Sequence, residues 1–327
     1  MTVRLVAGAP APPAWAYDAD IVILALDRAE ATAAAIASAL DQRGARCHLT
    51  VLDQGSRPEA LAQFAALIEG RADASLYASA ENLGVAGGRN LASGLGHGRA
   101  IVGLDNDATF DGAATVAGIL AALDVDPGLA ALGLRIVADA TGGDDLSSWG
   151  YPRALLARAG ECFEVATFVG AGHAIRRSAW AAAGGYDSRL FFCWEEYDFC
   201  LRAIAQGWRI GYRGDLVVRH KVSAEHRVAW SGRRWFFFVR NRLLIERKWG
   251  ASWPELMPRV AGYWAKGARS GLGGETWRAV AAAAAMEPGA ARPLPAAARA
   301  YLARVDGAHR DGFVRRVARE ILAGAGG

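Results

Sequence analysis

The sequence predicts an α/β fold with a parallel sheet in its first half and a helical extension at its C-terminus. Three observations support this prediction. Short apolar runs alternate with alanine-rich helical stretches, polar residues close or follow the runs, and the chain beyond residue 231 has a helical pattern. Strands that alternate with helices are typical of parallel sheets, because parallel neighbours need a long crossover connection.

The individual elements follow from these runs. Strands are expected at residues 20–26, 47–53, 74–79 and 100–105, with helices after the first strand to about residue 42, at 58–70 and at 84–96. The less regular middle of the chain predicts strands at 131–137, 164–177 and 208–220 and a helix at 194–207. Residues 235–250 and the alanine run at 279–285 belong to the helical extension.

The composition is that of a globular protein. The 327 residues are 53% apolar and 21% charged, which fits one large domain or one domain with an appendage. The four cysteines lack zinc-site spacing and indicate free thiols in a reducing compartment. Neither a signal peptide nor an apolar run of roughly 18 residues is present, so a cytoplasmic location is expected.

The charge is distributed unevenly. Residues 227–327 hold 18 Arg and Lys against 7 Asp and Glu, whereas residues 1–226 hold 19 against 26. We therefore expect an α/β domain at 1–226 and a basic helical extension at 227–327. Basic surfaces attract anionic partners, including anionic lipid, and a solvated arginine-rich surface is an equally open alternative.

Several acids are expected at one rim of the sheet. Asp27, Asp53, Asn82 and the residues from Asp105 to Asp107 close or follow predicted strands, and ligands of parallel sheets bind at the carboxyl ends of strands. Adjacent carboxylates repel, so the pair Asp105 and Asp107 favours a hard divalent cation, with a simple turn as the alternative. His220 ends a later strand and could add a ligand.

Three more acids cluster at the start of the helix predicted at 194–207. Glu195 and Asp198 share one helical face, and Asp198 precedes Arg202 by four positions, which predicts an ordinary ion pair. Glu196 has no charged partner three or four residues further on, so it is a candidate proton acceptor. Ordinary acidity at a helix start is the alternative for all three.

The stretch 81–90 combines glycines with Arg89, which could meet a phosphate. No G-x-G-x-x-G follows the first strand and no P-loop motif is present, which argues against the usual dinucleotide-binding and P-loop sites.

Taken in order, these motifs resemble a family of known enzymes. "VLDQGS", "ENLGVAGGRN", "LDND" and "GAGHAIRRSAWAAAGGYDSRLFFCWEEYDFCLRAIAQGW", followed by a strand ending in His, resemble family 2 glycosyltransferases of the A-type fold, in the rhamnosyltransferase-like branch. The resemblance covers about residues 18–250. It implies a Rossmann-like mixed sheet flanked by helices, and inverting transfer of a hexosyl or deoxyhexosyl group.

The resemblance also implies the ligands. They are a UDP-, dTDP- or GDP-sugar donor, a divalent Mn²⁺ or Mg²⁺ ion, and a hydroxyl acceptor on a cell-surface glycan, a lipid-linked glycan or a natural product. Nucleic acid is not an expected partner. The basic extension at 227–327 would offer a peripheral contact at the inner face of the membrane.

By motif match, Asp53 resembles the family residue that holds the nucleobase, and Asp107 and His220 resemble the metal ligands. Asp105 resembles the residue near the ribose and is also a candidate metal ligand. Glu196 matches the catalytic base, where the family usually has Asp, and Asp198 is the reserve. The donor site implied in this way comprises Asp27, Asp53, Asn82, Arg89, Asp105, Trp194 and Glu195.

Two other classes remain open on the sequence alone. A nucleotidyltransferase acting on sugar phosphates would also use an α/β sheet, a metal and carboxylates, although "ALDRAEAT" lacks the Gly-rich basic loop usual after its first strand. A non-catalytic sugar- or lipid-binding protein on the same fold is the third reading.

Overall fold

The computed structural model describes residues 3–221, 231–289 and 291–310. Ten described strands form one mixed sheet in the order β1-β4-β3-β2-β5-β9-β7-β10-β6, and β8 pairs with β10. The strands are β1 Val3–Gly8, β2 Ala19–Ala25, β3 Cys47–Asp53, β4 Ala74–Ser79, β5 Ala100–Leu104, β6 Ala108–Phe110, β7 Leu129–Ala138, β8 Cys162–Val165, β9 Gly172–Arg176 and β10 Arg209–His220.

The strand directions place several chain ends at one rim. Strands β2, β3, β4 and β5 are parallel neighbours, and β9 runs antiparallel to both β5 and β7. Because β10 is parallel to β7, it runs in the same direction as β5. The carboxyl ends of β2, β3, β5 and β10 therefore lie along the same edge of the sheet.

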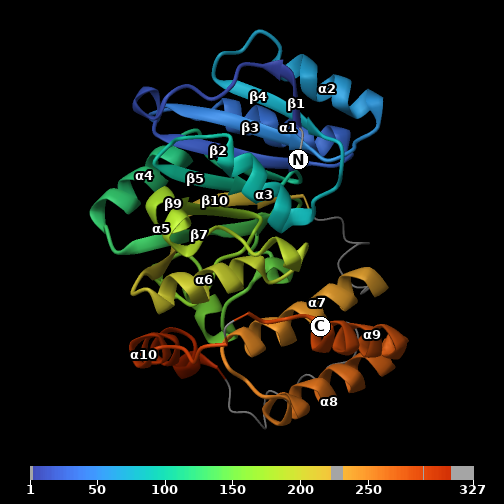
Figure 1. Ribbon diagram of the computed structural model, residues 1–327. Helices are drawn as coiled ribbons and strands as arrows, with labels where there is room; N and C mark the ends of the chain where they lie inside the picture. The colour runs from blue at the N-terminus through green and yellow to red at the C-terminus, as the bar shows by residue number, and fades with distance from the viewer. Residues whose placement is uncertain (1–2, 222–230, 290, 311–327) are drawn as a thin grey trace.

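Ten described α-helices surround and extend this sheet (Figure 1). They are α1 Ala29–Leu40, α2 Pro58–Ile68, α3 Gly84–Gly94, α4 Thr115–Val125, α5 Arg177–Ala183, α6 Glu195–Ala205, α7 Gly232–Lys248, α8 Trp253–Arg269, α9 Gly273–Ala285 and α10 Ala296–Val305. Among them, none has the length and apolar character that crossing a bilayer requires.

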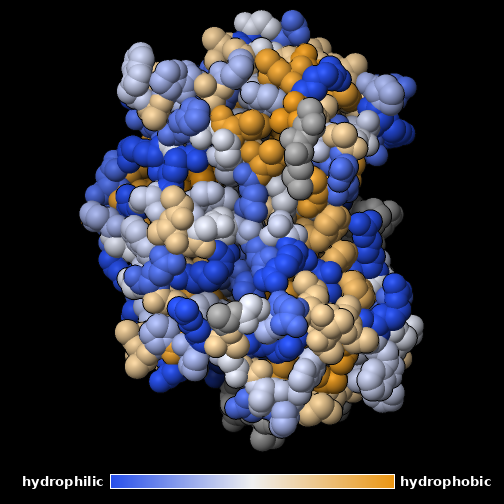
Figure 2. Space-filling model, in the orientation of Figure 1, coloured by the Kyte–Doolittle hydropathy of each residue, from blue (hydrophilic) through white to orange (hydrophobic). Residues whose placement is uncertain are grey.

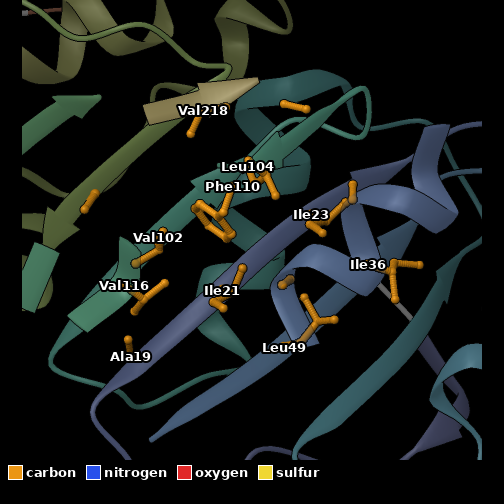
Figure 3. Packing of buried hydrophobic residues seen from close by; sticks show 14 of the residues in the cluster. Ala19, Ile21, Ile23, Ile36, Leu49, Val102, Leu104, Phe110, Val116 and Val218 are labelled. Atoms are coloured by element: carbon orange, nitrogen blue, oxygen red, sulfur yellow. The ribbon is translucent and has the colours of Figure 1, made fainter. Parts of the chain in front are cut away.

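The core lies on both faces of the sheet, because successive strand side chains point to opposite faces. In β2, Ile21 and Ile23 pack on one face with Ile36 of α1 and Val116 of α4 (Figure 3). Val22 packs on the other face, where α3, α5 and α6 lie. Each β2 residue from 21 to 23 is essentially inaccessible, which explains why this strand is a continuous apolar run.

The C-terminal helices form a further layer at the end of the molecule away from β1 (Figure 1). Trp235 and Val239 of α7 pack with residues of α8 and α9 in a separate apolar cluster. Leu244 of α7 instead packs against Leu201 of α6. Helix α10 returns to the sheet, where Tyr301 donates a hydrogen bond to the Val165 carbonyl at 3.0 Å.

Local sequence explains several helix ends. Ser231 caps α7 by accepting a hydrogen bond from the Arg234 N–H, and Ser252 and Glu255 form a capping box at α8. Gly184 ends α5 with a φ of 80°, a conformation that glycine adopts without strain.

Most predicted elements are confirmed, and strands β3 and β4 have the predicted bounds. The single strand expected at 164–177 is wrong. Its first residues pair with β10 as β8, whereas β9 inserts between β5 and β7, so the chain must leave the sheet between them. The predicted domain boundary between residues 226 and 227 lies outside the described residues.

A buried ion pair joins β2 to α5. Asp20 is fully buried and accepts hydrogen bonds from the Tyr17 hydroxyl at 2.6 Å and the Gly98 N–H at 2.8 Å, and it forms an ion pair with Arg177. We expect Asp20→Ala to lower the free energy of unfolding by about 3–5 kcal/mol, because Arg177 then keeps a largely buried, uncompensated charge. Urea denaturation measures this change.

The matched control is Asp18→Ala, two residues earlier, which removes a more exposed pair with Arg46. Exposed pairs contribute about 1 kcal/mol or less, so this variant should stay close to the unsubstituted protein. Equal losses in the two variants would contradict a special role for the buried pair.

Candidate active site

The turn after β2 is strained and brings Arg28 to the rim. Asp27 and Arg28 have φ angles of 52° and 50°, which are uncommon for residues other than glycine. The Asp27 carboxylate accepts a hydrogen bond from the Arg57 N–H at 2.9 Å, and this bond is the main cause that lowers the pKa of Asp27. The Arg28 guanidinium forms an ion pair with Asp107.

Two predicted donor-binding residues stabilise local turns. Asp53 is 2% exposed and accepts hydrogen bonds from the backbone N–H groups of Gly55 and Ser56 at 3.1 to 3.3 Å. Asn82 is exposed and accepts a hydrogen bond from the Gly84 N–H at 2.9 Å at the start of α3. Asp53 therefore has the turn-capping contacts that were the alternative to base recognition.

Arg89 lies buried beneath the rim and contacts Asp105. Its Nη2 donates to Asp105 Oδ1 at 2.7 Å and to the Gly170 carbonyl at 3.2 Å. Its Nε and Nη1 atoms are buried without a described hydrogen-bond partner. The Arg89 side chain is 4% exposed and that of Asp105 is 39% exposed, so the carboxylate rather than the guanidinium reaches the surface.

Asp107 and His220 form a pair supported from behind by a second carboxylate. His220 Nε2 lies 3.4 Å from Asp107 Oδ1, and its Nδ1 lies 2.9 Å from Asp145 Oδ2. Burial opposes protonation of His220, but the hydrogen bonds to Asp107 and Asp145 outweigh it and raise its pKa to about 9. A histidine held by a carboxylate at its far nitrogen is the usual arrangement of a metal-binding imidazole.

The residues present fit a divalent ion only in part. Within the described ranges, no three His, Cys, Asp or Glu side chains converge on one point as a ligand cluster. Asp107 and His220 lie together, but Asp105 is turned towards Arg89. Two protein ligands suit an ion whose remaining positions are taken by water and phosphate oxygens, which is the usual situation of Mg²⁺ at phosphate sites.

The start of α6 places two acids side by side in a buried setting. Glu195 is 2% exposed, and its Oε2 is buried without a described hydrogen-bond partner. Desolvation by burial raises its pKa well above the ordinary value and is also the main cause that raises the pKa of Glu196 to about 7. Glu196 is partly accessible, and the only described hydrogen bond to its carboxylate comes from its own N–H.

Asp198, unlike Glu195 and Glu196, is paired with cationic side chains. It is fully buried, and its two oxygens accept hydrogen bonds from Arg202 Nε at 2.9 Å and Lys248 Nζ at 2.5 Å. Lys248 also contacts Asp187 at 3.0 Å. The predicted ion pair of Asp198 with Arg202 is therefore present, and both oxygens of the reserve base are engaged in ion pairs.

Trp194 directs its polar group to the C-terminal helices. Its indole N–H donates to the Phe238 carbonyl at 3.0 Å, and its ring packs against Tyr197 and Phe238. The Arg242 guanidinium lies 4.9 Å from the centre of the same ring. The described contacts of Trp194 are thus with Tyr197 of α6 and with Phe238 and Arg242 of α7, and its donor contact stays a prediction.

Electrostatic coupling links the two halves of the site. The charges of Arg89 and Asp105 both act on the pKa of Glu196, after the larger effect of burial. The charge of Asp105 also acts on the pKa of His220, after burial and hydrogen bonding. The start of α6 and the pair Asp107–His220 are therefore both within range of the charge of Asp105, in one electrostatic site.

Sequence reasoning missed Arg28 and Asp145. Arg28 stands 79 residues before Asp107, and Asp145 stands 75 residues before His220. Neither follows a predicted strand end directly. The only signal was the unusual first turn "LALDRAE", which carries an arginine in the expected binding rim.

Solved structures with the same fold include nucleotide-bound enzymes. A mannosyltransferase from Pyrobaculum calidifontis in complex with GDP-Man and Mn²⁺ superposes with a TM-score of 0.56 at 20% identity, over 97% of this chain and 86% of that chain. GalNAc-T7 with UDP, GalNAc and Mn²⁺ gives 0.59 at 15% identity, over 81% of this chain and 54% of that chain.

S. aureus TarS 1–349 in complex with UDP gives a TM-score of 0.50 at 13% identity, over 81% of this chain and 88% of that chain. At such identities the likeness shows the fold alone. No curated protein sequence matches the chain significantly.

The sequence itself matches one family. Residues 20–182 match the profile described as Glycosyl transferase family 2, and this span contains the rim from Asp27 to Asp107. The mixed sheet flanked by helices is the A-type glycosyltransferase fold. The chain therefore belongs to glycosyl transferase family 2 and has the A-type fold.

Proposed function

We propose that this protein is an inverting, metal-dependent glycosyltransferase that moves a hexosyl or deoxyhexosyl group from a nucleotide sugar to a hydroxyl acceptor. The observation that carries the proposal is the state of Glu196. Its carboxylate has a raised pKa and no ion pair among the described residues, and it shares an electrostatic site with Asp105. Family membership favours sugar transfer over nucleotidyl transfer or mere binding.

The donor is a UDP-, dTDP- or GDP-sugar bound along the rim. The support is that the compared structures hold GDP-Man or UDP. Asp27, Asp53, Asn82 and Asp105 remain the proposed donor-binding residues on the family resemblance, together with Arg89, Trp194 and Glu195. To bind the nucleobase, the Asp53 carboxylate would need contacts in addition to its present hydrogen bonds within the turn.

Mn²⁺ or Mg²⁺ would be held by Asp107 and His220, with Asp105 as a further ligand. The support is the pair itself, the carboxylate behind His220, and the Mn²⁺ in two compared structures. Held there, the ion would neutralise charge on the leaving diphosphate. Asp107 and Arg28 are paired in the protein alone, so a cation at Asp107 competes with Arg28 for that carboxylate.

The chemical step needs a base on the acceptor side. The acceptor oxygen attacks the anomeric carbon as the bond from that carbon to the diphosphate oxygen breaks, and the hydroxyl proton passes to Glu196. One displacement inverts the anomeric centre. We assign the base to Glu196 rather than Asp198, because both oxygens of Asp198 already accept hydrogen bonds from cations.

The acceptor is a lipid-linked glycan, a cell-surface glycan or a natural product, and a peripheral membrane contact would serve the first of these. Trp264 and Met257 of α8 are 49% and 55% exposed, and Trp277 of α9 is 63% exposed. Met257 and Trp264 share a helical face because they are seven residues apart. Tryptophan and basic residues favour anionic membrane surfaces, and Figure 2 shows polar and apolar residues interspersed over this part of the molecule.

The first prediction here concerns the metal. Asp107→Ala should weaken Mn²⁺-dependent binding of UDP or GDP about a hundredfold or more, because it removes a direct ligand. Calorimetric titration with and without Mn²⁺ measures the loss. The control is Asp111→Ala, which removes an exposed pair with Arg219 next to the same strands. Undiminished transfer in excess EDTA would rule out the metal site.

The second prediction concerns the base. Glu196→Gln should lower kcat about 10²–10⁴-fold and leave donor binding intact, because the amide cannot accept the proton. Asp198→Asn should keep most of the rate but lower the free energy of unfolding by about 3–5 kcal/mol, since Arg202 and Lys248 lose their shared anion. Steady-state kinetics and urea denaturation separate the two effects, and the reverse pattern would make Asp198 the base.

The pH dependence follows from the same residue. Because Glu196 must be ionised to act, kcat of the unsubstituted enzyme should fall as the pH drops through about 7. A carboxyl whose pKa is raised by folding stabilises the protein below its unfolded value of 4.5 and loses that contribution as the pH rises through about 7. Glu196→Gln should therefore be more stable than the parent at pH 8, and a less stable variant would contradict burial of the charge.

The third prediction concerns the membrane surface. Trp264→Ser combined with Trp277→Ser should weaken partitioning into phosphatidylglycerol vesicles roughly tenfold, because two large side chains no longer enter the interface. Cosedimentation at several salt concentrations measures it. Trp15→Ser is the control, because Trp15 is 81% exposed and precedes β2 at the other end of the molecule. Failure of the unsubstituted protein to bind anionic vesicles would refute the contact.

A further inference from the structure

The residues just before the candidate base form a strained loop, Phe191–Trp194. Phe191, Cys193 and Trp194 have φ angles of 62°, 70° and 72°. Such angles are unfavourable for bulky residues and persist only where the surroundings impose them. The loop leads directly into α6, and no side chain caps the first turn of that helix. The loop conformation therefore sets where Glu195 and Glu196 begin.

The side chain of Asn241 in α7 contacts several backbone carbonyls in and beside this loop. Its fully buried Nδ2 lies 2.8 Å from the carbonyl oxygens of Leu190 and Phe192 and 2.9 Å from that of Cys193. An amide nitrogen carries two hydrogens, so these three carbonyls share them. One side chain from the C-terminal extension thus contacts two residues of the strained loop and Leu190 just before it.

The opposite side of the loop is held by α3. The backbone N–H groups of Val85 and Ala86 donate to the Phe191 carbonyl at 2.7 and 3.3 Å. Gly84 has a φ of 70°, and a Cβ atom added there would lie 2.3 Å from the same oxygen. Only glycine lets α3 approach this closely, so the loop is clamped between α3 and α7.

We propose that Asn241 is a positioning residue that holds the Phe191–Trp194 loop in the strained form that places Glu196 for proton transfer. The inference rests on the proposed role of Glu196 as the base. Asn241 does not touch the reacting atoms and acts only through the carbonyls of Phe192 and Cys193 in the loop and of Leu190 just before it. Without these donors the loop relaxes towards ordinary backbone angles, and the start of α6 moves with it.

Cys193 reports on the loop without any assay of activity. It is partly buried within the strained segment, whereas Cys200 is fully buried in α6. We expect Asn241→Leu and Asn241→Asp, which keep the approximate size but remove the donor, to raise the alkylation rate of Cys193 by N-ethylmaleimide about tenfold or more. Alkylation of Cys200 should stay slow, which excludes global unfolding. Peptide mass spectrometry distinguishes the two thiols.

The matched control is Thr276→Val in α9. Thr276 is also buried and accepts a hydrogen bond from the Trp235 indole at 2.8 Å, within the C-terminal helices and with no described contact to the loop. This variant should be destabilised without faster labelling of Cys193. Gly84→Ala tests the loop from the α3 side and should also raise Cys193 labelling, which keeps the test decisive if an Asn241 variant does not fold.

Kinetics test the consequence for catalysis. In the Asn241 variants kcat at saturating donor should fall at least tenfold, a larger change than any in the dissociation constant of UDP or GDP. If Cys193 is labelled as slowly in Asn241→Asp and in Gly84→Ala as in Thr276→Val, α3 and α7 do not hold the loop and the proposal is refuted. Faster labelling with unchanged kcat overturns the role of Asn241 in catalysis. If the unsubstituted protein transfers no sugar but Cys193 is labelled faster in the variants, the contact between Asn241 and the loop is supported and the proposed function is refuted instead.

Discussion

Mutual repulsion among carboxylates is the constraint on which the site depends. The fold gathers the ends of its parallel strands, and the acids they carry, at one edge of the sheet. In the protein alone, cationic side chains compensate them: Arg28 pairs with Asp107, Arg89 pairs with Asp105, and His220 lies between two carboxylates. A donor diphosphate with its cation would rearrange these pairs rather than enter an uncharged cavity. Glu195 and Glu196 escape this pairing, which is why burial raises the pKa of both carboxyls.

The C-terminal extension is joined to the site by polar contacts as well as apolar packing. Lys248 neutralises the buried Asp198 of α6, and Asn241 contacts the loop before that helix. Both come from α7, which also shares an apolar cluster with α6. A helix that sequence composition marks only as basic and aromatic therefore supports the position of the candidate base.

The features that were predicted correctly from the sequence are those that depend on interactions between residues close together in the chain. Residues 21–23 of β2 form an apolar run that is buried on both faces of the sheet, and the spacing of Asp198 and Arg202 is that of an ordinary helical ion pair. Long-range pairings left no local trace, because Arg28 and Asp107 meet across 79 positions. The loop at Phe191–Trp194 could not be predicted either, since bulky residues disfavour its backbone angles and only α3 and α7 impose them. Strand β1 was not predicted, because no pattern of a long helix follows its short apolar run. It joins the edge of the sheet through antiparallel pairing with β4.

The span that defines the family stops short of the parts that complete the site. Residues 20–182 contain the rim but exclude Glu196, His220 and Asn241. A chimera that exchanged only this span with a relative would combine one protein's candidate donor rim with another protein's candidate base and the loop before it. Because Gly84 of α3 fits closely against the Phe191 carbonyl, the new junction would bring together two surfaces that had not evolved as partners. Recombination that preserves these contacts must extend through Lys248, so the smallest transferable unit of this protein is larger than the span that matches the family.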